Sequence, residues 1–215
     1  MSKERGPHHP LYIAFADTIK QIGKVTNILA AYTISSRSPN AAWRGSVEQA
    51  GGGVVLDMGY HIFDLLIWYF DCPDVVDVVM SNSHPQNYDV EDTAHITFKI
   101  GDIPGSALIS CVYPEKREEI VILGTCGSAT LHNKKIERRN AGQEVVDVLE
   151  SPLGWSAAMI NQIDYFSRVI DGEIELKYGN PHFQVENHTR TLSACYLSSK
   201  TGKPVNVKNT NFLEV

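Results

Sequence analysis

Apolar residues recur along the chain at two spacings, and these predict where the helices and strands lie. Near the N-terminus Leu11, Phe15, Ile19 and Ile22 follow one another at intervals of three or four, which predicts a helix over residues 10–22. The same spacing predicts three further helices: residues 55–70, a segment from Trp155 to a stop at Gly172, and one from Asn180-Pro181 to a stop at Gly202.

Between the second and third of these helices, apolar and polar residues alternate, as is typical of half-buried strands. In the clearest case Ala94, Ile96, Phe98 and Ile100 face one way, and the intervening Thr93, His95, Thr97 and Lys99 face the other. Strands are predicted over residues 24–34, 92–100, 105–113, 119–123, 128–132, 144–149 and 205–207. Their short connections favour antiparallel neighbours. The pattern predicts an α+β fold: an open-faced, mostly antiparallel sheet covered on one face by helices.

The composition supports a globular domain with a sizeable core. Of the 215 residues, 43% are hydrophobic and 20% are charged. We expect an N-terminal tail over residues 1–7 and one domain over residues 8–215. The four cysteines form no C-x-x-C pair, which argues against a zinc site or a disulfide framework and favours reduced thiols.

Charge and missing motifs exclude several classes of function. The net charge is −6 and there is no basic block, so we expect no nucleic-acid partner. No apolar run approaches the length of a bilayer span, so no membrane partner is expected. The N-terminus lacks the apolar core of a signal peptide, which favours a cytoplasmic location. Neither G-x-G-x-x-G after a strand nor G-x-x-x-x-G-K-S/T occurs, so a nucleotide-binding module of either common type is absent from this sequence.

Candidate chemistry is densest over residues 51–64, which begin with three glycines. Asp57 and His61 are four residues apart, so a helix places them on one face, and Asp64 joins that face three residues later. A carboxylate beside an imidazole suits proton transfer near neutral pH, and the glycines would let another molecule approach the backbone. Spacing alone favours a solvated acidic residue beside a packed histidine, and it also allows a pair of metal ligands.

The same segment, G-G-G-x-x-x-D-x-G-x-H-x-x-D-L-x-x-W from Gly51 to Trp68, resembles the substrate-domain signature of the glucose–fructose oxidoreductase/inositol dehydrogenase/MocA family. Four other stretches resemble that family in the same order, so that the likeness covers residues 6–208. They are His9-Pro10-Leu11-Tyr12 with Ile22-Gly23-Lys24-Val25, then Val90-Glu91-Asp92-Thr93-Ala94, Gly124-Thr125-Cys126-Gly127-Ser128, and Ser198-Ser199-Lys200-Thr201-Gly202-Lys203-Pro204-Val205.

The resemblance implies half of an enzyme. Members of this family are two-domain NAD(P)-dependent oxidoreductases that act on sugars, cyclitols and related small molecules. A Rossmann domain precedes an open-faced sheet domain, and catalysis uses a lysine in an E-K-P motif with the aspartate and histidine of the signature. This chain has neither E-K-P nor the Rossmann domain. We therefore expect NAD or NADP in a full-length parent and none bound to this chain alone. A fragment, a natural truncation and part of a split enzyme all fit.

The resemblance also suggests roles for individual residues. His61 would be the base that takes a hydroxyl proton, Asp57 would orient it, and the lysine absent here would polarise the substrate oxygen. Asp64 would bind substrate or brace the helix, Tyr60 would line the pocket or be an ordinary half-buried ring, and Arg44 would hold substrate or be solvated. Four further histidines are interpreted as structural: His95, His132, His182 and His188.

Assembly is expected through the open sheet face. Leu108 and Val112 would extend the surface formed by Thr93, His95, Thr97 and Lys99, and two copies packed face to face would form a homodimer or homotetramer. A non-catalytic oligomerisation or carbohydrate-binding module is the alternative to the substrate-binding half of an oxidoreductase. A metal-dependent hydrolase, with metal at Asp57 and His61, is a third reading.

Overall fold

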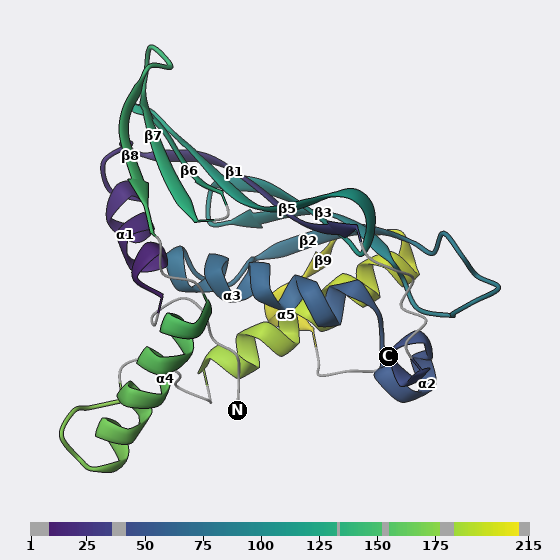
Figure 1. The fold of residues 1–215 in the computed structure, drawn as a ribbon. Coiled ribbons are helices and arrows are strands. Elements are labelled where there is room, and N and C mark those ends of the chain that lie inside the picture. Colours follow the sequence, from purple (N-terminus) through teal and green to yellow (C-terminus); the bar gives the residue numbers. More distant parts are fainter. Residues whose placement is uncertain (1–8, 36–41, 133, 152–154, 177–182, 211–215) are drawn as a thin grey trace.

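One open sheet with helices on one face forms the framework of the molecule (Figure 1). The computed structural model describes residues 9–35, 42–132, 134–151, 155–176 and 183–210, so the tail expected over residues 1–7 lies outside them. The strands of the described chain run in the order β8-β7-β6-β5-β1-β4-β3-β2-β9. They are β1 (Val25–Ser35), β2 (Val75–Ser81), β3 (Thr93–Ile100), β4 (Ile103–Ser110), β5 (Val112–Gly124), β6 (Gly127–His132), β7 (Lys135–Asn140), β8 (Val145–Glu150) and β9 (Val205–Asn206).

The helices lie below the sheet in Figure 1, with α3 and α5 side by side under its centre and α1 at one end. The helices are α1 (Pro10–Ile19), α2 (Val47–Ala50), α3 (Tyr60–Tyr69), α4 (Trp155–Ile170) and α5 (Phe183–Thr201). Short 3-10 or π turns complete the set: η2 (Ala42–Gly45), η3 (Val55–Gly59) and η4 (Val207–Asn209). The α+β, open-faced fold expected from the sequence is confirmed.

The core lies between the sheet and these helices. On β3 the side chains alternate strictly: Ala94, Ile96, Phe98 and Ile100 are buried, and His95 is exposed. The alternation predicted from the sequence is therefore confirmed, because one face of the sheet packs on helices while the other is open. The largest fully buried side chains come from both layers: Leu11, Phe15, Ile22, Phe63 and Leu66 from the helical layer and its connections, and Ile28, Ile96, Ile109 and Ile122 from the sheet.

The expectation that successive strands are neighbours is wrong at the centre of the sheet. Strands β4 and β5 are joined through Cys111 alone, yet β1 lies between them, parallel to β4 and antiparallel to β5. The chain crosses the end of β1, where Ser35 is opposite Val112. Thr33 secures this crossing: its buried hydroxyl donates to the Glu115 carbonyl at 2.7 Å and accepts from the Arg117 amide at 3.2 Å.

Two strands were not individually predicted. Strand β2 was included only in the general strand-rich region, and the sequence of β7, KIERRN, is too polar to read as a strand. The polar face of β7 is instead stabilised by ion pairs, since Glu137 contacts both Lys135 and Arg139.

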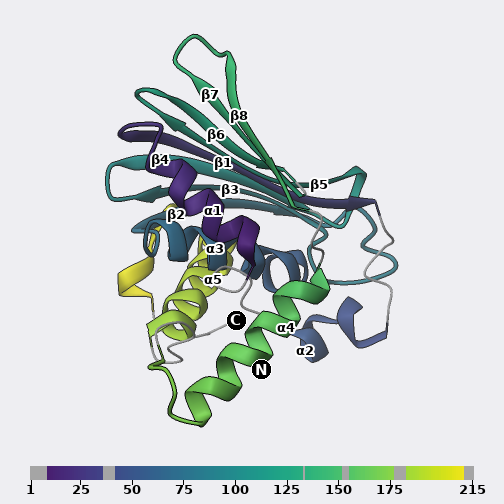
Figure 2. The same ribbon diagram turned by 60° about the vertical axis from the view of Figure 1, so that its left-hand side comes forward.

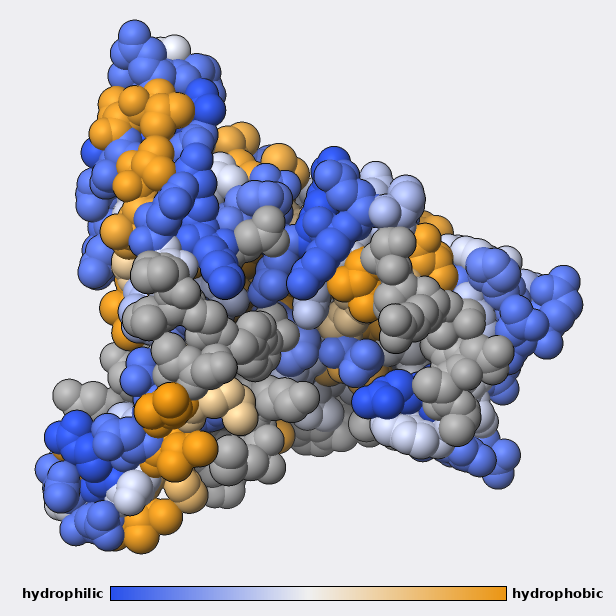
Figure 3. Space-filling view, in the orientation of Figure 1, coloured by the Kyte–Doolittle hydropathy of each residue, from blue (hydrophilic) through white to orange (hydrophobic). Residues whose placement is uncertain are grey.

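Helix α4 forms where its apolar stripe predicts, but the stripe is not buried by the described chain. It projects away from the sheet (Figure 2), and apolar side chains gather over it and over β8 in Figure 3. The exposed fractions are 40% for Met159, 57% for Ile163, 53% for Phe166 and 68% for Ile170.

The buried face of α5 is partly polar. His188, Thr191, Cys195 and Ser198 are buried, whereas the apolar Val185 is exposed. The face that packs inward therefore carries several polar groups, which apolar periodicity alone does not register.

The helical run from Val47 to Tyr69 corrects the expectation that no apolar run is long enough to cross a bilayer. It is 23 residues long and, by length and composition, apolar enough to cross a membrane, although no such run was expected. Of its most apolar window, 67% is buried inside the protein, as befits the central helix of a core.

Candidate functional site

Asp57, the first acidic residue of the signature, lies in an unusual helical turn. Residues Val55–Gly59 form a π turn that leads directly into α3, and Asp57 is at its centre with an exposed side chain. A π turn holds one more residue than an α turn and is frequent at functional sites. The extra residue rotates everything after it by about 100°, one residue's step in an α-helix. This rotation changes which signature residues share a face.

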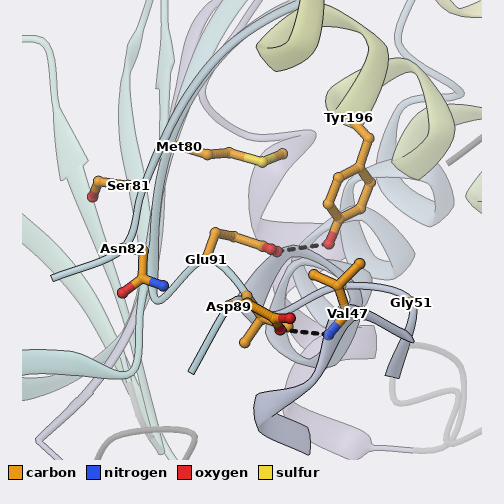
Figure 4. A pocket seen from close by; sticks show the side chains of 10 residues that line it. Val47, Gly51, Met80, Ser81, Asn82, Asp89, Glu91 and Tyr196 are labelled. Carbon is orange, nitrogen blue, oxygen red and sulfur yellow. Dashed lines mark hydrogen bonds between the residues drawn. The ribbon is translucent and has the colours of Figure 1, made fainter. Parts of the chain in front are cut away.

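A carboxylate from the sheet layer holds the start of this turn. Glu91, in the loop just before β3, accepts hydrogen bonds from the Gly53 amide at 2.9 Å and the Val55 amide at 3.1 Å. The Tyr196 hydroxyl of α5 donates to the same carboxylate at 2.6 Å (Figure 4). Burial, followed by the charge of Glu91, raises the pKa of Tyr196, so the hydroxyl stays protonated and donates. A negative charge also offsets the unpaired amides and the dipole at a helix N-terminus.

The Glu91 carboxylate with its three donors, called the carboxylate clamp below, explains why residues 52 and 53 are glycines. A Cβ on Gly52 would overlap the Tyr196 hydroxyl, and a Cβ on Gly53 would overlap the Glu91 carbonyl. The idea that the glycines admit another molecule is therefore wrong for these two, because the protein's own groups fill the space. A cavity of about 350 Å³ adjoins the clamp (Figure 4). Its lining includes Glu91 and Tyr196 but neither Asp57 nor His61.

His61 lies one turn after Asp57, half-buried between two aromatic rings. Its ring centroid is 6.1 Å from that of Tyr32 on β1 and 5.7 Å from that of Tyr60, both in edge-on arrangements. Its Nδ1 atom is buried. Neither a hydrogen bond nor an ion pair joins Asp57 to His61 in the described structure. Asp57 is thus placed to act near His61 only at longer range or through a bound molecule.

Asp64 does not share the exposed face of Asp57. Its side chain is only 2% exposed and points toward α5, where its Oδ1 lies 3.4 Å from Nε2 of His188. The rotation introduced by the π turn places Asp57 outside and Asp64 inside. Of the two roles considered for Asp64, bracing the helix fits this position and direct substrate contact does not.

Arg44 is exposed in η2, beside the helical start. Its guanidinium carbon lies 4.7 Å from the centroid of the Trp43 ring, a cation–π arrangement. The segment is tied to the sheet layer because Asp89 accepts from the Val47 amide at 2.6 Å and its own amide donates to the Gly45 carbonyl. The structure therefore keeps Arg44 near the site without bringing it to His61.

Sequence reasoning missed a second polar cluster next to the clamp. Asp92 is fully buried and accepts from the Tyr88 hydroxyl at 2.7 Å and the Ser83 amide at 2.7 Å. Burial alone would raise the pKa of Asp92, but these hydrogen bonds outweigh it and lower the pKa. The signal was present in Val90-Glu91-Asp92, which was noted only as the start of a strand. One acidic residue of that motif holds the signature helix and the next fastens the loop before β3.

Among the described residues, no group of three or more His, Cys, Asp or Glu side chains is placed to hold a metal ion. The helix N-terminus at Gly53 would be the natural seat for a pyrophosphate. The Glu91 carboxylate already occupies it, and a second anion there would be repelled.

Comparison with known proteins places these observations in a family. A family model described as the GFO/IDH/MocA C-terminal domain matches residues 19–130, slightly more than half of the chain. No curated protein matches.

Solved structures share the fold at low sequence identity. Levoglucosan dehydrogenase in complex with NADH and levoglucosan aligns with a TM-score of 0.81 and 17% identity, over 96% of this chain and 65% of that one. Aldose-aldose oxidoreductase from Caulobacter crescentus, complexed with glycerol, aligns with a TM-score of 0.79 and 16% identity, over 95% and 62%. GenD2 from gentamicin A biosynthesis, in complex with NAD, gives 0.73 and 20%, over 94% and 62%.

This chain thus spans less than two thirds of the length of these solved structures. The family match covers β1, the signature helix and the sheet through most of β6, which includes Glu91, Asp57 and His61. The chain belongs to the GFO/IDH/MocA C-terminal domain family.

Proposed function

We propose that this chain is the substrate-binding and catalytic half of an NAD(P)-dependent oxidoreductase that oxidises or reduces a sugar, cyclitol or related small molecule by hydride transfer. The observation that carries the proposal is the placement of Asp57 and His61. The first is exposed in a π turn, the second is half-buried one turn later, and both lie on the helix that the family signature marks. Solved structures with this fold include proteins in complex with NADH and levoglucosan, or with glycerol.

In this proposal the chain's own residues bind the substrate and move its proton. The imidazole of His61 accepts the proton of the reacting hydroxyl, and the rings of Tyr32 and Tyr60 limit the orientations that the imidazole can take. The side chain of Asp57 is exposed to solvent. Once substrate is bound, it contacts either a second substrate hydroxyl or the exposed edge of the His61 imidazole. The dinucleotide must be held by another domain or chain, since the helix N-terminus at Gly53 is already neutralised.

The test measures turnover by the protein expressed from its complete open reading frame. NAD⁺ and NADP⁺ reduction is followed at 340 nm with a panel of aldoses, anhydrosugars and cyclitols. We expect His61→Asn to lower kcat by about 10²–10⁴-fold, the usual contribution of a positioned base. His132→Asn, at an exposed position on β6, is the control and should stay within about twofold.

Two results would overturn the proposal. If His61→Asn turns over at the wild-type rate, His61 is not the base. If a protein that contains a cofactor domain binds saccharides but reduces neither dinucleotide, the chain is a carbohydrate-binding module instead.

We also propose that the open sheet face joins two copies of the chain. Its exposed apolar side chains include Leu29 at 44%, Val79 at 71% and Leu123 at 37%. Cross-strand pairing places Val79 beside His95 and His95 beside Leu108, and these residues line a shallow groove of about 380 Å³. A two-fold axis through such a surface buries it against itself.

A further inference from the structure

Four aromatic rings form a row through the candidate site. His188 of α5, Tyr60 and His61 of α3, and Tyr32 of β1 follow one another with centroid separations of 4.9, 5.7 and 6.1 Å. Successive ring planes are inclined by 59°, 72° and 61°. Such inclined, edge-on contacts are favourable and directional, so moving one ring disturbs the next. The row links a helix at one end of the site to the sheet at the other.

The end of this row on α5 is a buried polar pair. His188 is 3% exposed and Asp64 is 2% exposed, with 3.4 Å between Nε2 and Oδ1. Burial lowers the pKa of His188 to about 4, so its imidazole is neutral at pH 7. Nε2 faces the carboxylate oxygen, but the geometry is not that of a hydrogen bond, so the two groups form a close polar contact held where α3 packs against α5.

Stability alone gives little reason to keep a buried polar pair here. Well-packed apolar residues of similar volume generally hold two helices together as well as a buried polar pair does, or better. The neighbouring Phe63 and Leu66 of α3 are fully buried apolar side chains. A polar pair among them is explained by its neighbour, because the ring of His188 packs on Tyr60, next to His61.

We propose that Asp64 and His188 are positioning residues that, through the ring of Tyr60, fix the orientation of the His61 imidazole. The inference rests on the proposed role of His61 as the proton acceptor. It also makes α5 the common support of the site. Tyr196, two turns beyond His188, holds the turn that carries Asp57 by way of Glu91. One helix thereby sets the positions of both signature residues.

The test observes His61 directly and needs neither cofactor nor substrate. The imidazole of His61 is titrated by ¹H–¹³C NMR in the full 215-residue chain, with its signal assigned by its loss in His61→Asn. His188→Phe keeps a ring against Tyr60 but leaves Asp64 facing an apolar group. His188→Gln keeps a donor near the ε position but removes the ring. His132→Gln, at an exposed position on β6, is the matched control.

We expect both His188 variants, and Asp64→Asn, to shift the His61 titration midpoint by about 0.5 pH unit or more, because the imidazole changes its contacts with both tyrosine rings. His132→Gln should leave the midpoint within about 0.1 unit. If His188→Phe does not fold, His188→Gln and Asp64→Asn decide the question by the same measurement.

An unchanged His61 midpoint in the folded variants would overturn the inference and leave the pair a packing feature. That result would not affect the proposed function, whose own test is the turnover of His61→Asn. Conversely, a shifted midpoint in a protein without dehydrogenase activity would support the positioning and count against the function.

Discussion

Removing the Glu91 carboxylate should loosen the signature helix more than any exposed acidic substitution. Glu91 accepts three hydrogen bonds, from the Gly53 and Val55 amides and the Tyr196 hydroxyl, at 2.9, 3.1 and 2.6 Å. In Glu91→Ala these three donors lose their acceptor at once, at the end of a helix whose dipole favours a negative charge.

The size of the effect follows from these contacts. A hydrogen bond to a charged group contributes about 1.5–3 kcal/mol, and a good helix N-cap about 1 kcal/mol. Glu91 is half-buried, so water replaces part of what is lost. We therefore expect Glu91→Ala to lower the free energy of unfolding by about 3 kcal/mol rather than by the full sum. Glu91→Gln keeps one acceptor oxygen and should cost about 1–2 kcal/mol, and Tyr196→Phe about 1 kcal/mol.

Urea unfolding followed by circular dichroism measures these differences, provided that the dependence of the free energy on urea is the same for all variants. The control is Glu48→Ala, an exposed acidic residue of α2, which should change the free energy by less than about 0.5 kcal/mol. If Glu91→Ala is no less stable than Glu48→Ala, the carboxylate does not hold the helix, and our account of the Gly52-Gly53 segment fails with it.

Three further outcomes are expected. Gly53→Ala should lower the free energy of unfolding in urea by about 2 kcal/mol or more, because its Cβ overlaps the Glu91 carbonyl. In the control Gly142→Ala the Cβ meets only a side-chain oxygen, so the loss should be less than about 1 kcal/mol. Equal losses would contradict the steric argument. Titration calorimetry of this chain with NADH or NADPH should detect no binding, since it lacks a glycine-rich βα turn, and micromolar affinity would show that a cofactor site was overlooked. Light scattering after size exclusion should give a mass of twice the chain mass of 23.9 kDa. Lys99→Glu, on the open face, should lower the measured mass toward that of one chain. A wild-type mass near 23.9 kDa at micromolar concentrations would refute the dimer.

Local patterns determined most of the elements. The alternation along β3 and the helical spacing in α1 and α4 are properties of a few consecutive residues, so the sequence alone was enough to place them. The signature around Asp57 and His61 was likewise readable, because a family motif is a local string of residues.

The tertiary structure decided what depends on residues far apart in the chain. No local pattern reveals that β1 separates β4 from β5, since sheet order is set by which strands bury the same core. The π turn takes up one residue more than an α turn, but no feature of the local sequence marks it, so the spacing of Asp57 and Asp64 did not reveal that they face apart. The Glu91 clamp spans 38 residues to Gly53 and 105 to Tyr196, so only folding brings its parts together. The partner of Asp64 is similarly remote. His188 looked like an isolated histidine because a buried polar contact is defined by three-dimensional distance and exclusion of water, neither of which is encoded in sequence spacing.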